Sequence, residues 1–308
     1  MKDLYSVAGV SKQALWKYKV RREHNRQVVR QLVKVMDQIR KRHKRMGSRS
    51  MYYSCTEPLP VGRDKFEQIG LSNGFRVKRK RNVRKTTRSQ LIEVYPNLIE
   101  GLTLNGINQV WQSDMFYHKV EGRDYYGVTI MDVYSRKLLA LLMSKSLSAL
   151  ALEKAMKKAL KARAGQDLGG CIFHSDRGGQ YISDIQKQLL SSYNMKISMC
   201  ILPQENAYVE RIQGTLKEDY LEAMDLREDN LAYMVKKITY LYNHEKPHRA
   251  LQMRTPDAFE QYVLKLPENL RPELTIYQWD HELLTKSQVA NKKKKEAKKK
   301  KSTIIQQV

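Results

Sequence analysis

The clearest pattern along the chain is a set of apolar runs that alternate with short polar breaks between residues 109 and 144. The runs span 109–120, 125–135 and 137–144, and only a few residues separate them. Runs of this length joined by tight connections are typical of an antiparallel meander. The sequence therefore predicts three consecutive strands in this part of the chain.

Helical spacing takes over after the meander. The apolar positions of segment 147–165 share one helical stripe, made of Leu152, Ala155, Met156, Ala159 and Leu160. A strand at 170–175, a helix opened by Ser183, a strand at 196–201 and a helix from about residue 206 follow. The order β-β-β-α-β-α-β-α predicts an α/β fold of the ribonuclease H-like kind, with a mixed five-stranded sheet flanked by helices.

The first part of the chain has a helical pattern throughout. Within segment 1–46, Gly9 predicts a turn and Ser11 predicts the cap of the next helix. We expect Ala14, Leu15 and Tyr18 to face inward on that helix. Lys12, Gln13 and Lys17 then face outward and are expected to bind DNA. This arrangement predicts a small, all-α, helix-turn-helix-like region.

Segment 47–100 predicts a second helical element that ends at Gly74 and runs into a basic strand or wing. The expected DNA contacts of this wing are Lys78, Arg79, Lys80 and Arg81. A packing domain followed by a basic linker at 76–88 is the alternative reading. Pro96, Gly101 and Gly106 mark the boundary to the next domain. We expect the catalytic core at 101–265 and a C-terminal extension with a disordered, Lys-rich tail at 266–308.

Charge is distributed very unevenly over these segments. The formal net charge is +25, of which residues 1–100 hold +17 and residues 291–308 hold +7, so the centre of the chain is nearly neutral. Basic flanks around a neutral working domain indicate a protein that binds a polyanion, because each neutralised phosphate releases counterions. Double-stranded DNA is the expected partner. A solubilising surface with a floppy lysine tail is the alternative.

Other classes are excluded by composition. No run approaches the ~20 apolar residues of a membrane span, and the N-terminus lacks the order of a signal peptide. The three cysteines, Cys55, Cys171 and Cys200, are widely spaced and form no CxxC pair, which argues against a disulfide framework or a zinc site. We therefore expect a cytoplasmic protein associated with the nucleoid, with no membrane partner.

Three acids occupy informative places in the neutral centre. Strand alternation puts Asp114 on the same face as residues that should be buried, where a lone acid is costly unless something satisfies it. Asp176 ends the strand at 170–175, whose end can lie beside the strand of Asp114. Glu210 lies in the first turns of the helix that starts near residue 206, where the positive helix end favours a carboxylate.

Converging carboxylates repel one another unless cations join them, and hard oxygen ligands suit Mg²⁺. We therefore predict that Asp114, Asp176 and Glu210 are both catalytic residues and ligands of Mg²⁺ or Mn²⁺, with two ions in the site. Lys217, two helical turns after Glu210, and Arg177, beside Asp176, are the predicted DNA contacts of the core. Each acid also has an ordinary alternative as a strand-end, turn or helix-start residue.

Four stretches in this order resemble one known family. They are "NQVWQSDMFYHKVEGRDYYGVTIMDVYSRKLL", "FHSDRGGQY", "ENAYVERIQGTLKEDY" and "YLYNHEKPHRALQMRTPDAF". Together they resemble the DDE transposases encoded by the second reading frame of IS-three-type bacterial insertion sequences, which are relatives of retroviral integrases. The 33 residues between Asp176 and Glu210 are slightly fewer than the family usually has, a shortening that falls in the loop before the helix.

The resemblance implies an integrase-type core with its catalytic triad on Asp114, Asp176 and Glu210 and its basic residue on Lys217. It also implies metal-dependent cleavage of the element's DNA ends, followed by joining of the freed 3′-hydroxyls to target DNA. The expected partners are the terminal repeats, target DNA, further copies of the chain, and an upstream-frame product present as a partner or a fusion. A metal-dependent nuclease on the same fold and a catalytically inactive DNA-binding repressor are the alternatives.

Overall fold

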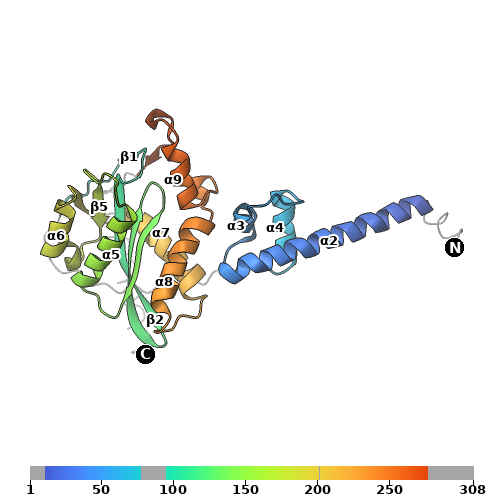
Figure 1. Ribbon diagram of the computed structural model, residues 1–308, viewed down its shortest axis with the longest axis horizontal. Helices are drawn as coiled ribbons and strands as arrows, with labels where there is room; N and C mark the ends of the chain where they lie inside the picture. The colour runs from blue at the N-terminus through green and yellow to red at the C-terminus, as the bar shows by residue number, and fades with distance from the viewer. Residues whose placement is uncertain (1–10, 78–94, 201, 277–308) are drawn as a thin grey trace, which may run out of the picture.

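A five-stranded mixed sheet forms the centre of the chain in the computed structural model, which describes residues 11–77, 95–200 and 202–276 (Figure 1). The strand order is β4-β3-β2-β5-β6. Its strands are β2 Val110–Val120, β3 Arg123–Asp132, β4 Leu138–Ser144, β5 Ile172–Ser175 and β6 Lys196–Met199. β2, β3 and β4 pair antiparallel, whereas β5 pairs parallel with β2 and with β6. The predicted meander and the predicted mixed sheet are confirmed.

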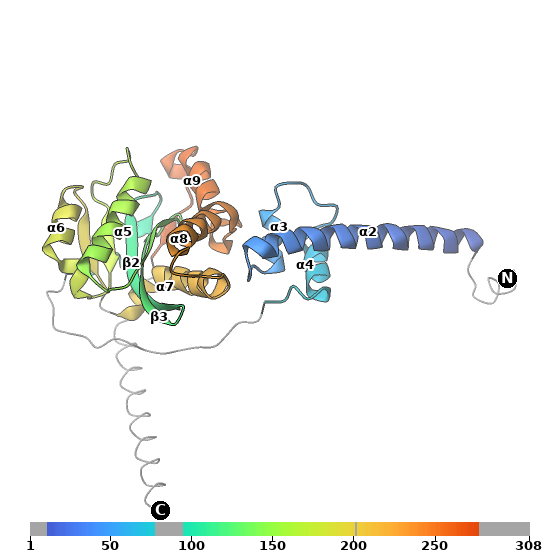
Figure 2. The ribbon, with the colours of Figure 1, turned by 60° about the horizontal axis from the view of Figure 1, so that its bottom comes forward.

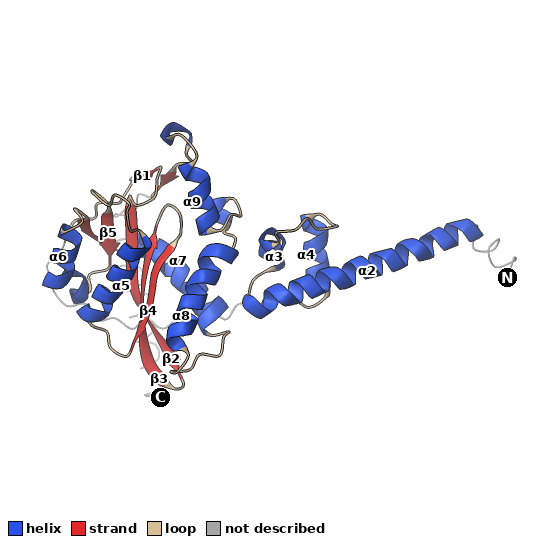
Figure 3. Ribbon diagram, in the orientation of Figure 1, coloured by secondary structure: helices blue, strands red, loops and turns tan. Residues whose placement is uncertain are grey.

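Helices cover both faces of this sheet (Figure 3). α5 and α6 pack on one face, and α7, α8 and the π-helical turns η3 and η4 pack on the other. Their bounds are α5 Ala149–Ala162, α6 Asp184–Ser191, α7 Ala207–Thr215, η3 Leu216–Leu221, α8 Leu231–Tyr240 and η4 Leu241–Glu245. All five residues of the predicted α5 stripe are buried, and Ser183 caps α6 through the main-chain amide of Gln186.

A third group of apolar residues closes one end of the core. β1 Thr103–Leu104 pairs antiparallel with β7 Leu274–Thr275, and α9 Pro256–Leu264 packs against the π-helical turn η4. Ile99 and Ile276 are both buried in this group. Residues 266–276, which the sequence pattern assigns to a C-terminal extension, therefore pack on the core.

The N-terminal part is helical, as expected. It contains α2 Lys12–Arg42, α3 Ser48–Ser54 and α4 Arg63–Ser72, which share a small core around Met36, Met51 and Phe66. The side chain of Ser11 caps α2 as predicted, accepting a hydrogen bond from the amide of Ala14 over 3.1 Å. The predicted helix-turn-helix depends on a turn at Gly9, which lies outside the described residues.

The expectation that Ala14 and Tyr18 face inward is wrong for the described part of the chain. Both are exposed, and 57 % of the Tyr18 surface is accessible. The reason is that α2 runs as one helix of 31 residues, and only its second half packs against α3 and α4. The first half of α2 therefore presents its basic surface without a packing partner among residues 11–77, 95–200 and 202–276.

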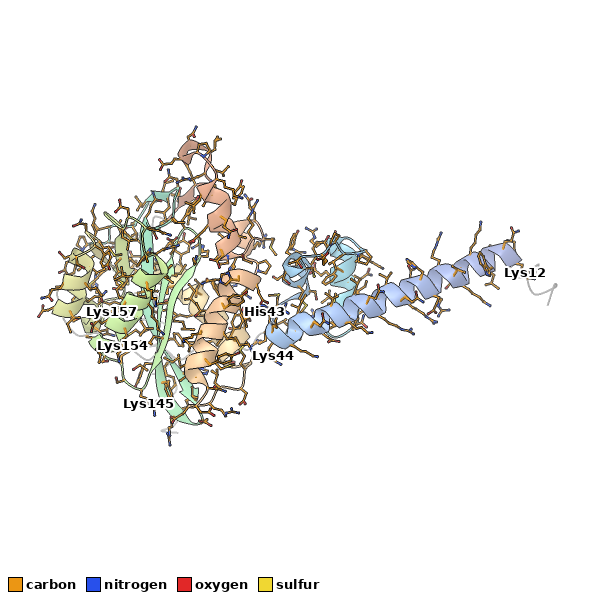
Figure 4. The ribbon with its side chains drawn as sticks, viewed as in Figure 1. Lys12, His43, Lys44, Lys145, Lys154 and Lys157 are labelled. Carbon is orange, nitrogen blue, oxygen red and sulfur yellow. The ribbon has the colours of Figure 1, made fainter. Side chains whose placement is uncertain are left out.

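A buried histidine joins the N-terminal helices to the core (Figure 4). His43, at the end of α2, accepts a hydrogen bond from the Tyr220 hydroxyl over 3.0 Å and donates one to the Glu245 carboxylate over 3.2 Å. Arg42 binds the same carboxylate over 2.8 Å. This junction ties α2 to η3 and η4. In the part of the chain that the structure describes, no helix is long and apolar enough to span a membrane.

Candidate active site

The parallel pairing of β2 and β5 brings Asp114 and Asp176 together. Ser113 is paired with Ser175; Asp114 is the next residue of β2, and Asp176 directly follows the end of β5. Successive side chains point to opposite faces, so the two aspartates emerge on the same face of the sheet. β5 ends at Ser175, so Asp176 lies just beyond the carboxyl end of β5, beside the middle of β2.

The two carboxylates are half-buried and share one negative environment. Burial, reinforced by the charge of Asp176, raises the pKa of Asp114 to about 7. Burial also raises the pKa of Asp176. Among the described residues, no lysine or arginine forms an ion pair with either carboxylate. Two neighbouring acids with raised pKa values and no ion-pair partner are the electrostatic condition under which a cation binds or a proton is held.

Main-chain amides orient both aspartates. Asp114 accepts a hydrogen bond from the amide of Met115 over 2.8 Å, and Asp176 accepts one from the amide of Gly178 over 3.1 Å. A Cβ on Gly178 would lie 3.1 Å from the Asp176 carboxylate. The φ of Gly178 is −73°, in the range open to other residues, so this glycine serves the close approach of the carboxylate rather than an unusual turn.

Glu210 approaches the same face of the sheet from α7. It lies in the first turn of that helix, as predicted, and its side chain is exposed. Its charge contributes to the raised pKa of Asp114, after burial and Asp176. No three histidine, cysteine or acidic side chains lie close enough to hold a metal ion in the described ranges. The structure thus brings Asp114 and Asp176 together, whereas the Glu210 carboxylate does not join them in a group that could hold a metal ion among the described residues.

Buried amides that the sequence analysis did not single out hold α7 on the sheet. The side chain of Gln112 donates to the carbonyl of Glu205 over 3.0 Å and accepts from the amide of Val209 over 3.1 Å. Gln213, one turn after Glu210, donates to Thr129, whose hydroxyl donates to the Asp114 carbonyl. The only sequence signal for Gln112 was its alternation with Asp114 on one face of the strand.

Lys217 lies where the sequence placed it, although the helix changes its winding there. α7 passes into the π-helical η3 at Leu216, so the two-turn spacing from Glu210 crosses into wider turns. The Lys217 ammonium lies 4.8 Å from the centre of the Phe116 ring. Burial lowers the pKa of Lys217, and the charge of Asp114 opposes that shift. Lys217 therefore faces the carboxylates.

The other predicted DNA contacts that the structure describes are exposed. Lys12, Gln13 and Lys17 are exposed on the free half of α2. Arg177 is exposed beside Asp176, and its Nε atom donates to the carbonyl of Cys200 over 3.1 Å. Lys78, Arg79, Lys80 and Arg81 lie outside the described residues.

Comparison with protein-family models identifies the core. A model described as "Integrase core domain" matches residues 105–202, and a second model with the same description matches residues 193–256. These ranges cover the sheet, the helices on both of its faces, and all three predicted acids.

Curated relatives are insertion-element proteins. The chain is 29% identical over 225 residues to an insertion element IS600 uncharacterized 31 kDa protein from Shigella sonnei, covering 70% of this chain and 81% of that protein. It is 31% identical over 175 residues to the transposase for insertion sequence element IS904 from Lactococcus lactis, covering 54% of this chain and 67% of that protein. Transposase InsF for insertion sequence IS3A from Escherichia coli is 29% identical over 195 residues, which cover 61% of this chain and 66% of that protein.

Solved structures with similar folds include retroviral integrases. The HTLV-2 integrase catalytic core domain in complex with magnesium aligns with a TM-score of 0.42 at 20% identity, over 52% of this chain and 99% of that one. A chain from the simian T-cell lymphotropic virus intasome in complex with PP2A regulatory subunit B56 gamma aligns with a TM-score of 0.44 at 17% identity, over 74% of this chain and 73% of that one.

The sheet topology and the two core matches define the class: this is an integrase-core enzyme, a polynucleotidyl transferase that acts on DNA. Within that class, the similarity to the insertion-element proteins is decisive. The chain belongs to the DDE transposases of IS3-type insertion sequences, and it is a DNA transposase.

Proposed function

We propose that Asp114, Asp176 and Glu210 form the catalytic site of this transposase and hold two divalent cations, Mg²⁺ or Mn²⁺, between them. The observation that carries this proposal is the register of β2 and β5, which sets Asp114 and Asp176 side by side, with the Lys217 ammonium near Asp114 but in no ion pair with it among the described residues. Carboxylate oxygens are the ligands that Mg²⁺ prefers. The donor set therefore fits the metal.

Glu210 is the ligand that must move. Its side chain is exposed and carries no ion pair with a described residue, so rotation toward the two aspartates breaks no salt bridge. α7 itself does not have to move, because Gln112 and Gln213 fix it to the sheet. We infer that Glu210 completes the site when cations and DNA are present.

The reaction has two phosphoryl-transfer steps. In the first step, water attacks a phosphodiester at the end of the element, and the bond to the 3′-oxygen breaks to free a 3′-hydroxyl. In the second step, that hydroxyl attacks a target phosphodiester, forms a new P–O bond and releases a target 3′-hydroxyl. When bound, a pair of divalent ions stabilises the attacking and the leaving oxygens of such displacements. In both steps Lys217 holds a DNA phosphate beside the carboxylates, and no covalent link between protein and DNA is needed.

Partners follow from this chemistry. Two element ends have to meet one target, so we propose that several copies of the chain assemble on double-stranded DNA at the nucleoid. Help from an upstream-frame product, as a partner or a fusion, fits the same scheme. Mass measurement of the complex on DNA tests the assembly: more than one copy per bound DNA supports it, and a single copy contradicts it.

A strand-transfer assay tests the catalytic assignment. The substrate is a duplex with the DNA end that flanks this gene and a free 3′-hydroxyl, incubated with a target plasmid and Mg²⁺ or Mn²⁺. We expect joined product from the wild-type chain and none from Asp114→Asn, Asp176→Asn or Glu210→Gln. Asp225→Asn, which changes an exposed acid far along the chain, is the matched control and should stay active.

The alternatives give different products. Cleavage without joined product would indicate a nuclease on the same fold. Wild-type activity in all three acid variants would overturn the catalytic assignment, and an inactive wild-type chain that still binds DNA would favour a repressor. A second readout does not depend on turnover: Mn²⁺ should raise the melting temperature of the wild-type chain and not that of Asp114→Asn, because a ligand stabilises only the state that binds it.

A further inference from the structure

A basic cleft lies on the side of α7 that faces away from the carboxylates. Its volume is about 910 Å³, and it opens between the chain just after α2 on one side and α7 with residues 246–250 on the other. Figure 2 shows α2 and α3 meeting the core beside α7. The side chain of Arg45 crosses this boundary and donates to the carbonyl of Glu218 over 3.2 Å. We call it the α7 cleft.

Positive charge in the α7 cleft exceeds what the cleft's own acids neutralise. Asp219 is paired with Lys246 over 2.8 Å. Arg136, Arg211 and Arg249 line the cleft, and their guanidinium groups have no carboxylate partner among the described residues. Arg211 and Arg249 are exposed. Three arginines without acidic partners around one hollow are suited to an anionic ligand.

Two buried polar atoms in the wall of the cleft also lack partners. The guanidinium of Arg136 stacks on the Tyr208 ring at 4.0 Å from its centre, and its Nη1 atom is buried with no hydrogen-bond partner. The Nε2 atom of His248 is likewise buried without a partner. An unsatisfied buried polar group costs free energy, so native structures usually supply each one with a partner. Both side chains line the cleft, and a side-chain rotation that exposes either atom would let it bond to a ligand oxygen.

The two faces of α7 separate this cleft from the catalytic site. Glu210, Gln213 and Lys217 follow one another at spacings of three and four residues, which places them on one face of the helix. Tyr208, Arg211 and Thr215 follow the same spacing on another face, and these three line the cleft. The same helix thus borders the carboxylates on one side and the basic hollow on the other.

We propose that the α7 cleft binds the phosphodiester backbone of a DNA segment other than the one being cut. Arg211 and Arg249 contact its phosphates from the surface, and Arg136, held flat on Tyr208, contacts them from inside. The guanidinium fork matches the oxygens of a phosphate. This inference rests on the proposed function, because a transposition complex must hold flanking or target DNA in addition to the reacting strand.

Salt-dependent DNA binding tests this site. A short, fluorescently labelled duplex is titrated with the wild-type chain, Arg211→Gln and Arg249→Gln over a range of salt concentrations. Each variant should bind roughly tenfold more weakly at low salt, and its slope of log affinity against log salt should fall by about one. The double variant should lose about two. Lys161→Gln, which removes an exposed charge from α5 on the opposite face of the sheet, is the control and should bind as the wild type does.

Further variants separate the possible failures. Arg211→Lys should keep most of the wild-type slope of log affinity against log salt, unlike Arg211→Gln, because lysine retains the positive charge. Asp114→Asn should bind DNA normally and fail only to cleave, so a wrong catalytic assignment leaves the cleft assignment standing. Wild-type affinity and slope in Arg211→Gln, Arg249→Gln and the double variant would overturn the proposal. Polyaspartate serves as a second probe. If the two arginine variants lose polyaspartate binding but bind DNA as the wild type does, the proposal is overturned and the cleft is assigned to an acidic protein segment.

Discussion

The side-chain amide of Asn206 donates a hydrogen bond to the main-chain carbonyl of Ser113 over 3.2 Å. Ser113 directly precedes Asp114, and Asn206 is the residue from which α7 begins. One hydrogen bond therefore ties the start of the helix that carries Glu210 to the strand that carries Asp114. The distance between two of the proposed metal ligands depends on it.

Asn206→Ala should consequently slow catalysis more than it destabilises the fold. We expect the cleavage rate to fall by roughly 10- to 100-fold, because small displacements of reacting groups are costly, while DNA affinity stays unchanged. The free energy of unfolding should fall by about 1 kcal/mol. Single-turnover cleavage and urea unfolding measure the two effects. Asn230→Ala, which removes hydrogen bonds within an exposed loop, is the control and should cleave normally; a wild-type rate in Asn206→Ala would contradict the prediction.

Gly127→Ala should destabilise the core beneath Lys217. Gly127 pairs with Phe116 across β2 and β3, and a Cβ there would lie 2.2 Å from the Phe116 ring. The ring is buried and supports Lys217, so its displacement should cost about 1–3 kcal/mol of unfolding free energy. Gly214→Ala makes a sharp comparison, since a Cβ there meets nothing within 4 Å and alanine is the better helix former by ~1 kcal/mol. In urea unfolding, the midpoint concentration should fall for Gly127→Ala and rise for Gly214→Ala.

A buried ionic triad gives a third prediction. Arg163 binds Glu260 over 2.8 Å and Asp132 over 3.4 Å, and all three side chains are buried. Arg163→Met leaves the buried Asp132 carboxylate without its cation and leaves Glu260 with the Lys137 ammonium alone, which should lower the free energy of unfolding by about 3–5 kcal/mol. Lys157→Met removes an exposed partner of Glu153 and should change it by less than ~1 kcal/mol. Equal effects of the two substitutions in denaturant unfolding would show that the buried triad contributes no more to stability than an exposed ion pair.

Stability should fall in acid because of His174. This side chain is fully buried between β2 and β6, and burial lowers its pKa to about 4 from the ordinary value of 6.5. The unfolded chain therefore takes up a proton below pH 6.5, whereas the folded chain does not until about pH 4. The stabilisation is complete above pH 6.5 and is lost as the pH falls toward 4, at up to ~1.4 kcal/mol per pH unit. His174→Gln should flatten this dependence in unfolding measured from pH 7 to 4; an unchanged slope would exclude His174 as the cause.

Local patterns carried most of the fold. The meander, the α5 stripe and the Ser183 cap each depend on residues close together in the chain, so the sequence alone predicted them. The pairing of Asp114 with Asp176 needed the fold topology, which element order suggested and family resemblance supported. The sequence predicted that Glu210 and Lys217 lie on one helix. In the structure, the charges of both act on Asp114.

Long-range hydrogen bonds escaped the sequence analysis. Gln112 bonds to residues 93 and 97 positions away, and its alternation with Asp114 along the strand says nothing about those distant partners. The π-helical turn at Leu216–Leu221 is equally silent, because its residues fit an ordinary helix. The α7 cleft escaped for a similar reason: Arg136, Arg211 and Arg249 are far apart in sequence, and only the meeting of separate elements gathers them.

The single long helix α2 sets the distance between its N-terminal lysines and the core. Its 31 residues at 1.5 Å each span roughly 46 Å, and its far end is fastened to the core through His43. Duplex DNA rises 3.4 Å per base pair, so the helix is about 14 base pairs long. If Lys12 binds DNA as expected, the bound duplex would lie about this far from His43. The length of α2 would then set the distance between that DNA segment and the core.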